Sequence, residues 1–149
     1  MIVFVGADHN GFRMKEQILG YLAMRGVSHV DVGDKELNPE DDFPHFARAA
    51  VLELLSSEDS DPRAILVCGS GQGMSMAANR FKGVRASVVW DTTEARTTRN
   101  DNDSNVLCLP AIALEGKDDL WKDIIDTWLK TPFAAAPRYV RRNNELDEM

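Results

Sequence analysis

Long hydrophobic runs, excess positive charge and a disulfide-forming set of cysteines are all missing from this sequence of 149 residues. The longest apolar stretch, Val106 to Leu114, contains Pro110 and is too short to cross a membrane as a helix. Lysine and arginine number 17 against 24 aspartates and glutamates, giving a formal net charge of −7. This balance argues against broad binding to nucleic acid or to a membrane surface. An anionic ligand must instead be attracted by a few well-placed cationic groups.

Cysteine is scarce, since Cys68 and Cys108 are the only two. Each belongs to an apolar run typical of a strand, and their spacing matches neither a disulfide framework nor a metal site. We therefore expect no bound metal and a reducing, cytoplasmic location. The hydrophobic fraction of 44% is close to the average for globular proteins, and the length suits one domain over residues 1–149.

Short β-rich runs alternate with helical patterns along the chain. Strands are predicted over residues 2–5, 27–32, 64–68, 84–90 and 105–109. Helices are predicted over 11–25, 43–55, 74–81, 92–99 and 120–129. This alternation indicates an α/β fold, a single Rossmann-like (flavodoxin-like) three-layer domain with a five-stranded parallel sheet and a C-terminal helical tail at 131–149. In such folds ligands bind at the carboxyl ends of the strands.

The most informative segment is the run from Cys68 to Gly73, in which three glycines alternate with other residues directly after a predicted strand. Backbone N–H groups in such a turn form an anion cradle, and the start of the following helix favours a thiolate at Cys68. In a P-loop a lysine and then a Ser or Thr follow the last glycine. Here Met74 and Ser75 follow Gly73, so the lysine is missing and the loop is not a P-loop. The alternative interpretation is a glycine-rich turn beside a buried cysteine.

Three further groups of polar residues are candidates for a site. Asp8 and His9 follow the first predicted strand, with a helix cap and a solvated loop residue as the alternatives. Arg138 and Arg142 share a helical face suited to clamping a phosphate, or belong to a solvated terminal helix. The polar run Asp101–Asn105 is typical of a loop, and we expect it, too, to meet the edge of the sheet.

Taken together, these segments resemble the ribose-5-phosphate isomerase B family, which includes the subunits of galactose-6-phosphate isomerase. The resemblance spans nearly the whole chain and is carried by Gly6–Phe12, Asp42–Pro44, Cys68–Gly73, Ala77–Arg80, Gly83–Ala86, Asn102–Leu107, Arg138 and Arg142. It implies an aldose–ketose isomerase (an intramolecular oxidoreductase) that acts on a phosphosugar through an enediol, without metal or cofactor. It also implies a homodimer or pair of dimers with shared active sites, in which residues 131–149 pack on a partner subunit.

The resemblance also implies roles for individual residues. Cys68 is the base that moves a proton between C1 and C2, Ser70 assists proton transfer between the oxygens, and Asp8 assists ring opening. Substrate and phosphate contacts fall to His9, Gly69, Gly71, Gly73, Asn79, Asn102, Arg138 and Arg142, some of them from a neighbouring subunit. The N–H groups around Gly71 and Gly73 stabilise the enediolate.

Three positions depart from what the family usually has. Asp101 stands where a histidine opens the furanose ring, Ile112 where an arginine often contacts phosphate, and Phe43 where a tyrosine precedes the proline. Met74 stands where some members have a glutamate base, which favours Cys68 as the base here. Ribose 5-phosphate is the expected substrate, with Asp101 as a candidate acid or base. The alternatives are an isomerase of another phosphosugar, such as an open-chain tetrose or a hexose, and a catalytically silent phosphosugar-binding module.

Overall fold

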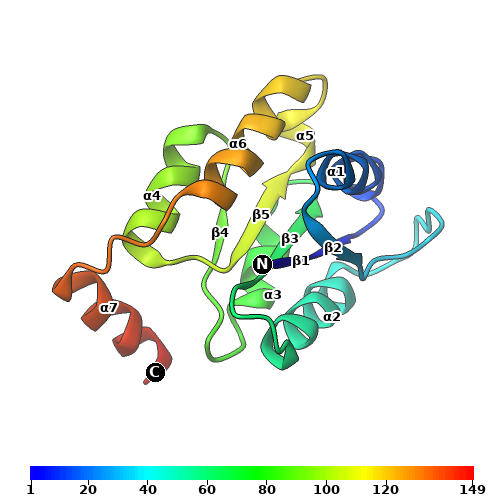
Figure 1. Cartoon of the computed structure of the whole chain (residues 1–149). Coiled ribbons are helices and arrows are strands. Elements are labelled where there is room, and N and C mark those ends of the chain that lie inside the picture. The colour runs from blue at the N-terminus through cyan, green and yellow to red at the C-terminus, as the bar shows by residue number, and fades with distance from the viewer.

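The computed structural model describes all residues from 1 to 149 and has one sheet at its centre (Figure 1). Its five strands are β1 (Ile2–Ala7), β2 (Ser28–Asp31), β3 (Pro62–Cys68), β4 (Ala86–Val88) and β5 (Val106–Pro110). All pairings are parallel, in the order β2-β1-β3-β5-β4. The predicted three-layer α/β fold is confirmed. Compared with the flavodoxin order 2-1-3-4-5, the last two strands have exchanged places, and β4 lies at the edge.

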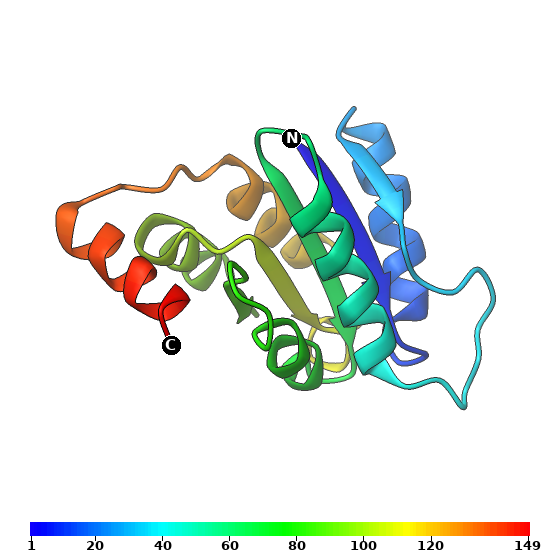
Figure 2. The same cartoon turned by 90° about the horizontal axis from the view of Figure 1, so that it is seen from below.

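Helices cover both faces of the sheet (Figure 2). One face carries α1 (Phe12–Met24), α4 (Thr92–Asn102) and α6 (Asp118–Lys130), and the other carries α2 (Phe43–Ser56) and α3 (Gln72–Ala78). The short α5 (Ala111–Leu114) follows β5, and α7 (Pro137–Asp147) ends the chain. The sequence pattern missed α5 because a single helical turn is too short to show a period.

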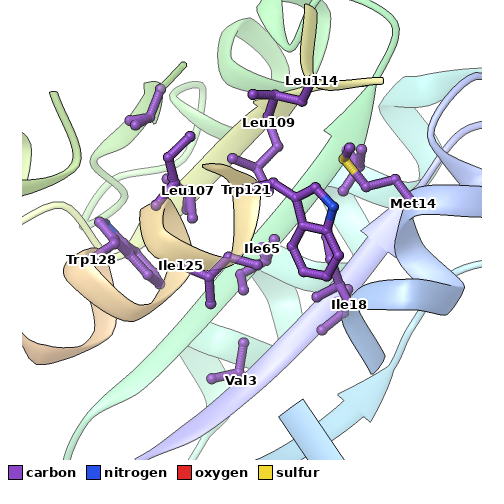
Figure 3. Packing of buried hydrophobic residues seen from close by; sticks show 14 of the residues in the cluster. Val3, Met14, Ile18, Ile65, Leu107, Leu109, Leu114, Trp121, Ile125 and Trp128 are labelled. Carbon is purple, nitrogen blue, oxygen red and sulfur yellow. The ribbon is translucent and has the colours of Figure 1, made fainter. Parts of the chain in front are cut away.

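Two cores hold these layers together because successive residues of a strand point to opposite faces. The core beneath α1 and α6 joins strand residues Val3, Ile65 and Leu107 to Ile18, Trp121 and Trp128 (Figure 3). The core beneath α2 and α3 joins Phe4, Leu66 and Cys108 to Phe46, Val51 and Met74. Burial on both faces fixes the register of the central strands, because a slip of one residue would exchange the two faces.

Because all strands are parallel, the sheet has a carboxyl edge, where the strands end, and an amino edge, where they begin. At the carboxyl edge, Ala7 of β1 pairs with Val67 of β3, and Cys68 pairs with Pro110 of β5. At the amino edge lie the first residues of the same strands. The chain passes from β1 to β2 on one side, whereas β3 lies on the other side of β1. This reversal leaves a crevice at the carboxyl edge, where ligands bind in open α/β sheets.

The C-terminal segment stands apart from the layers. An extended stretch leads from α6 to α7, and Figures 1 and 2 show α7 beside the end of α4 rather than against the sheet. Of the eleven residues in α7 only Asn143 is buried. The helix is attached near its end, where the Gly83 N–H donates to the carboxylate of Asp147 at 2.9 Å.

Candidate active site

Asp8 directly follows β1 at the carboxyl edge and is almost fully buried. Its carboxylate accepts a hydrogen bond from the Gly11 N–H at 3.0 Å, and its own N–H donates to the Val67 carbonyl at 3.3 Å. Burial raises the pKa of Asp8 above its ordinary value, and the bond from Gly11 opposes part of that shift. Asp8 therefore holds the turn into α1 and is also a carboxyl group that retains its proton more readily than an exposed one.

His9 follows Asp8 and is held by Asp41, a residue that the sequence analysis did not single out. One carboxylate oxygen of Asp41 lies 2.6 Å from His9 Nδ1 and also accepts the His9 backbone N–H at 3.0 Å. The hydrogen bond to Asp41 raises the pKa of His9 and favours the imidazolium. Asp41 comes from the acidic loop before α2, and nothing in that loop's composition distinguishes it from its neighbours.

Cys68 ends β3, in the strand next to β1, with its side chain only 5% exposed. Its Sγ accepts a hydrogen bond from the Gly71 N–H at 3.2 Å. Gly71 has a φ of 74°, in the left-handed region that favours glycine, and this conformation turns the N–H back toward the sulfur. This backbone donor fixes the position of the Cys68 sulfur at the carboxyl end of β3.

The rest of the glycine loop is hydrogen-bonded to α5 and α3. The Gly69 carbonyl accepts the Ile112 N–H at 3.0 Å, which fixes the start of α5 against the loop. Ser70 is exposed, and its hydroxyl accepts the Gln72 N–H at 3.3 Å. The loop is therefore ordered by the chain itself, with the Ser70 side chain on the open side.

Phe43 covers the start of α3. A Cβ added to Gly73 would lie 2.9 Å from the Phe43 ring, so a larger residue there would push the ring aside. The N–H groups of Gly73 and Met74, in the first turn of α3, have no intrahelical acceptor. The Phe43 ring and the free N–H groups of Gly73 and Met74 therefore lie together at the end of the loop that begins at Cys68.

Asp101 and Asn102 lie elsewhere, in the last turn of α4. They precede Val106, which begins β5 and pairs with Ala64 of β3. Four residues of strand, about 13 Å, separate that level from Cys68. The segment meets the amino edge, the edge opposite to Cys68, because it enters β5 rather than leaving it. The expectation of a loop is also wrong for these two residues, since α4 continues through Asn102.

Arg138 and Arg142 are exposed on α7, one helical turn apart. The Arg138 guanidinium lies 5.2 Å from the centre of the Tyr139 ring. Both belong to the part of the molecule around the end of α4, remote from the carboxyl edge (Figure 1).

Asn79 follows α3 and fastens it to β4. Its side-chain amide donates to the Ala86 carbonyl at 2.9 Å and accepts the Ala86 N–H at 2.9 Å. Both ends of the Asn79 amide are therefore engaged with the backbone of β4.

Apart from Asn79, the candidate residues thus form two groups. We call Asp8, His9, Cys68, Ser70 and the glycines Gly69, Gly71 and Gly73 the carboxyl-edge group. We call Asp101, Asn102, Arg138 and Arg142 the amino-edge group. A single chain does not bring the two groups together. No helix is both long and apolar enough to span a membrane, and no three His, Cys, Asp or Glu side chains cluster as metal ligands would.

Comparison with known proteins identifies the family. The model of the Ribose/Galactose Isomerase family matches residues 3–146. Ribose-5-phosphate isomerase B of Escherichia coli is 39% identical over 126 residues, covering 83% of this chain and 80% of the relative. The 4-deoxy-4-sulfo-D-erythrose isomerase of a Clostridium species is 36% identical over 133 residues, covering 89% and 81%.

Solved structures agree over nearly the full length. A ribose 5-phosphate isomerase of Thermotoga maritima superposes with a TM-score of 0.92 at 38% identity, covering 99% of this chain and 98% of that one. Ribose-5-phosphate isomerase B of Mycoplasma genitalium with bound ribulose-5-phosphate has a TM-score of 0.89 at 32% identity, covering 99% and 94%. The chain therefore belongs to the ribose/galactose isomerase family, and the resemblance seen in the sequence is confirmed.

Proposed function

We propose that this protein interconverts ribose 5-phosphate and ribulose 5-phosphate. In the aldose-to-ketose direction, a base removes the proton from C2, an enediolate forms, and the proton returns to C1. The hydroxyl proton passes from O2 to O1, so no external oxidant or reductant is needed. The observation that carries the proposal is the buried Cys68 sulfur, held by a backbone N–H at the crevice of the sheet. The Escherichia coli and Mycoplasma genitalium relatives support the choice of substrate by their names.

Cys68 is the base in this mechanism. The Gly71 N–H holds the Cys68 sulfur in place at the crevice, where it can abstract a proton from the carbon next to a carbonyl. Because the Gly71 N–H is bonded to sulfur, the enediolate is stabilised chiefly by the N–H groups of Gly73 and Met74. Ser70, exposed on the loop, carries the proton between O1 and O2. Asp8, whose pKa is raised by burial, acts as the acid or base in ring opening.

A second copy of the chain completes the site. Substrate at Cys68 is out of reach of the amino-edge group of the same chain. In a two-fold dimer the amino edge of each subunit meets the carboxyl edge of the other, so two equivalent complete sites arise. Arg138 and Arg142 of one subunit then bind the phosphate of a sugar held at Cys68 of the other, and residues 131–149 pack on the partner.

A second candidate substrate is an open-chain tetrose bearing an anionic group at C4. The Clostridium relative is named for such a sugar. A tetrose substituted at C4 cannot close a furanose ring, so the ring-opening histidine that Asp101 replaces would not be needed. The apolar Ile112 also leaves fewer cations for a phosphate dianion than an arginine would.

The test is a comparison of kcat/KM for three substrates with the purified protein. They are ribose 5-phosphate, erythrose 4-phosphate and 4-deoxy-4-sulfo-erythrose. A preference for ribose 5-phosphate supports the first proposal, and a preference for either tetrose supports the second. Binding of these sugars without turnover would contradict both and identify a phosphosugar-binding module.

A further inference from the structure

A cavity of about 530 Å³ opens beside His9, between the first turns of α1 and the α5 segment. It adjoins the glycine loop through Ile112, which lines the cavity and also donates its N–H to Gly69. Ile112 Cδ1 lies 3.3 Å from where a Cβ on Gly69 would stand. A sugar whose reacting carbons lie at Cys68 can therefore extend its far end past Ile112 into this cavity.

Arg13 is the arginine of this cavity and has no partner in the chain. Its side chain is exposed, makes no hydrogen bond or ion pair, and lines the cavity together with Gln17, one helical turn further along α1. Lys15, two residues away, is instead fully buried, with its Nζ bonded to both carboxylate oxygens of Asp31 at 2.9 and 3.0 Å. The first turn of α1 thus carries one cation engaged in the fold and one that is free.

Because of the charges around the cavity, binding of an anion there depends on Arg13. Glu115 and Asp118 also line it, and the imidazole of His9 is already bonded to Asp41. Without Arg13, an anion would meet two carboxylates opposed by one histidine. The guanidinium remains charged at every working pH and presents a fork of donors that matches a tetrahedral oxyanion.

We infer that Arg13 is a specificity-determining residue that binds the anionic tail of the substrate, a phosphate or a sulfonate, in the cavity beside His9. The inference rests on the proposed isomerase function and adds a contact from the same chain to the arginines of the amino-edge group. Because Arg13 lies at the far end of the sugar, it contributes to binding and leaves the proton transfer at Cys68 unchanged.

Arg13→Gln tests the inference, with Arg48→Gln as the matched control. Arg48 is an exposed arginine of α2 that makes no hydrogen bond or ion pair. We expect Arg13→Gln to raise KM for the preferred substrate roughly tenfold to a hundredfold, the effect of losing a charged hydrogen bond, with kcat nearly unchanged. Arg48→Gln should retain both constants. Arg13→Lys should recover part of the loss, because it restores the charge without the fork. Equal KM values for wild type and Arg13→Gln would overturn the inference.

Competitive inhibition by inorganic phosphate and by methanesulfonate separates the two kinds of tail. The inhibition constant of the anion that Arg13 binds should rise in Arg13→Gln by a factor similar to the rise in KM. Unchanged inhibition constants for both phosphate and methanesulfonate would contradict the assignment. If the wild type turns over none of the sugars, the proposed function fails by itself. Calorimetric binding of inorganic phosphate to wild type and Arg13→Gln then decides the inference, since loss of binding in the variant supports it and equal binding overturns it.

Discussion

Cys68 and Cys108 belong to the same core, yet their sulfur atoms have different surroundings. Cys108 lies in the middle of β5 and is completely buried, and this burial strongly raises the pKa of its thiol. Cys68 lies where β3 ends and receives the Gly71 N–H. Position along the strand thus separates an inert thiol from the candidate base.

Cys68→Ala is expected to lower kcat by about 10²- to 10⁴-fold, the usual contribution of a positioned base. Cys108→Ala, the matched control, should keep kcat close to that of the wild type. Steady-state kinetics of aldose–ketose conversion provide the measurement. Full activity in Cys68→Ala would assign the base to another residue.

The pair of His9 and Asp41 makes a separate prediction about pH. Because the hydrogen bond to Asp41 raises the pKa of His9, the imidazolium persists to higher pH than that of a free histidine. Asp41→Asn removes the charged acceptor, so His9 should lose its proton at lower pH. NMR titration of the His9 ring should show a lower midpoint in the variant, with His45 on the surface of α2 as the internal reference. An unchanged midpoint would contradict the role given to Asp41.

At the scale of elements, the turn from β1 into α1 depends on one glycine. A Cβ on Gly11 would lie 2.3 Å from the Val67 carbonyl oxygen, far inside contact distance, whereas a Cβ on Gly20 would meet nothing within 4 Å. The first glycine lets α1 start directly against β3, and this contact positions Asp8 beside the glycine loop. The second merely interrupts the helix.

The two glycines therefore predict opposite effects of alanine. Gly11→Ala should lower the free energy of unfolding by about 1–3 kcal/mol through overpacking. Gly20→Ala should raise it by about 0.5–1 kcal/mol, because alanine favours the helix and restricts the unfolded chain. Urea unfolding followed by circular dichroism measures both. A Gly11→Ala variant as stable as the wild type would mean that the turn can shift away from Val67.

The helices and strands follow the hydrophobic periods of the sequence closely, with instructive exceptions at the ends. The helix predicted at 92–99 continues to Asn102, because Asp103 adopts a left-handed conformation that closes it, with its N–H bonded to the Arg99 carbonyl. A polar helix end and a polar loop look alike in sequence, so the boundary was missed. The strand predicted at 84–90 is shorter, Ala86–Val88, as an edge strand pairs on one side only.

At the scale of the whole molecule, the separation of the two groups predicts sharing between subunits. In the proposed homodimer, Cys68→Ala and the double variant Arg138→Gln/Arg142→Gln should each damage both sites. In a mixed dimer, one site combines an intact Cys68 with intact arginines. Unfolding and refolding an equal mixture should therefore restore about a quarter of the wild-type activity, by random pairing of subunits.

The control for this experiment carries all three substitutions in one chain. Mixed with Cys68→Ala, the triple variant can form no intact site and should restore nothing. Failure of the first mixture to regain activity, with dimers demonstrated by light scattering, would mean that each chain builds its site alone.

The sequence alone determined the layered α/β fold and named most of the residues of the candidate site. Hydrophobic periods dictate which faces are buried, and Asp8, His9 and the Cys68–Gly73 loop directly follow strands, so their place at the carboxyl edge follows from local order. Only the tertiary structure decided the rest. Asp41 reaches His9 across 32 positions of sequence, and Arg13 shares a cavity with Ile112 because α1 and α5 meet there. Asp101 and the tail arginines lie at the opposite edge. The direction of a strand sets the edge at which the chain enters it, and local sequence patterns do not report this direction for a loop.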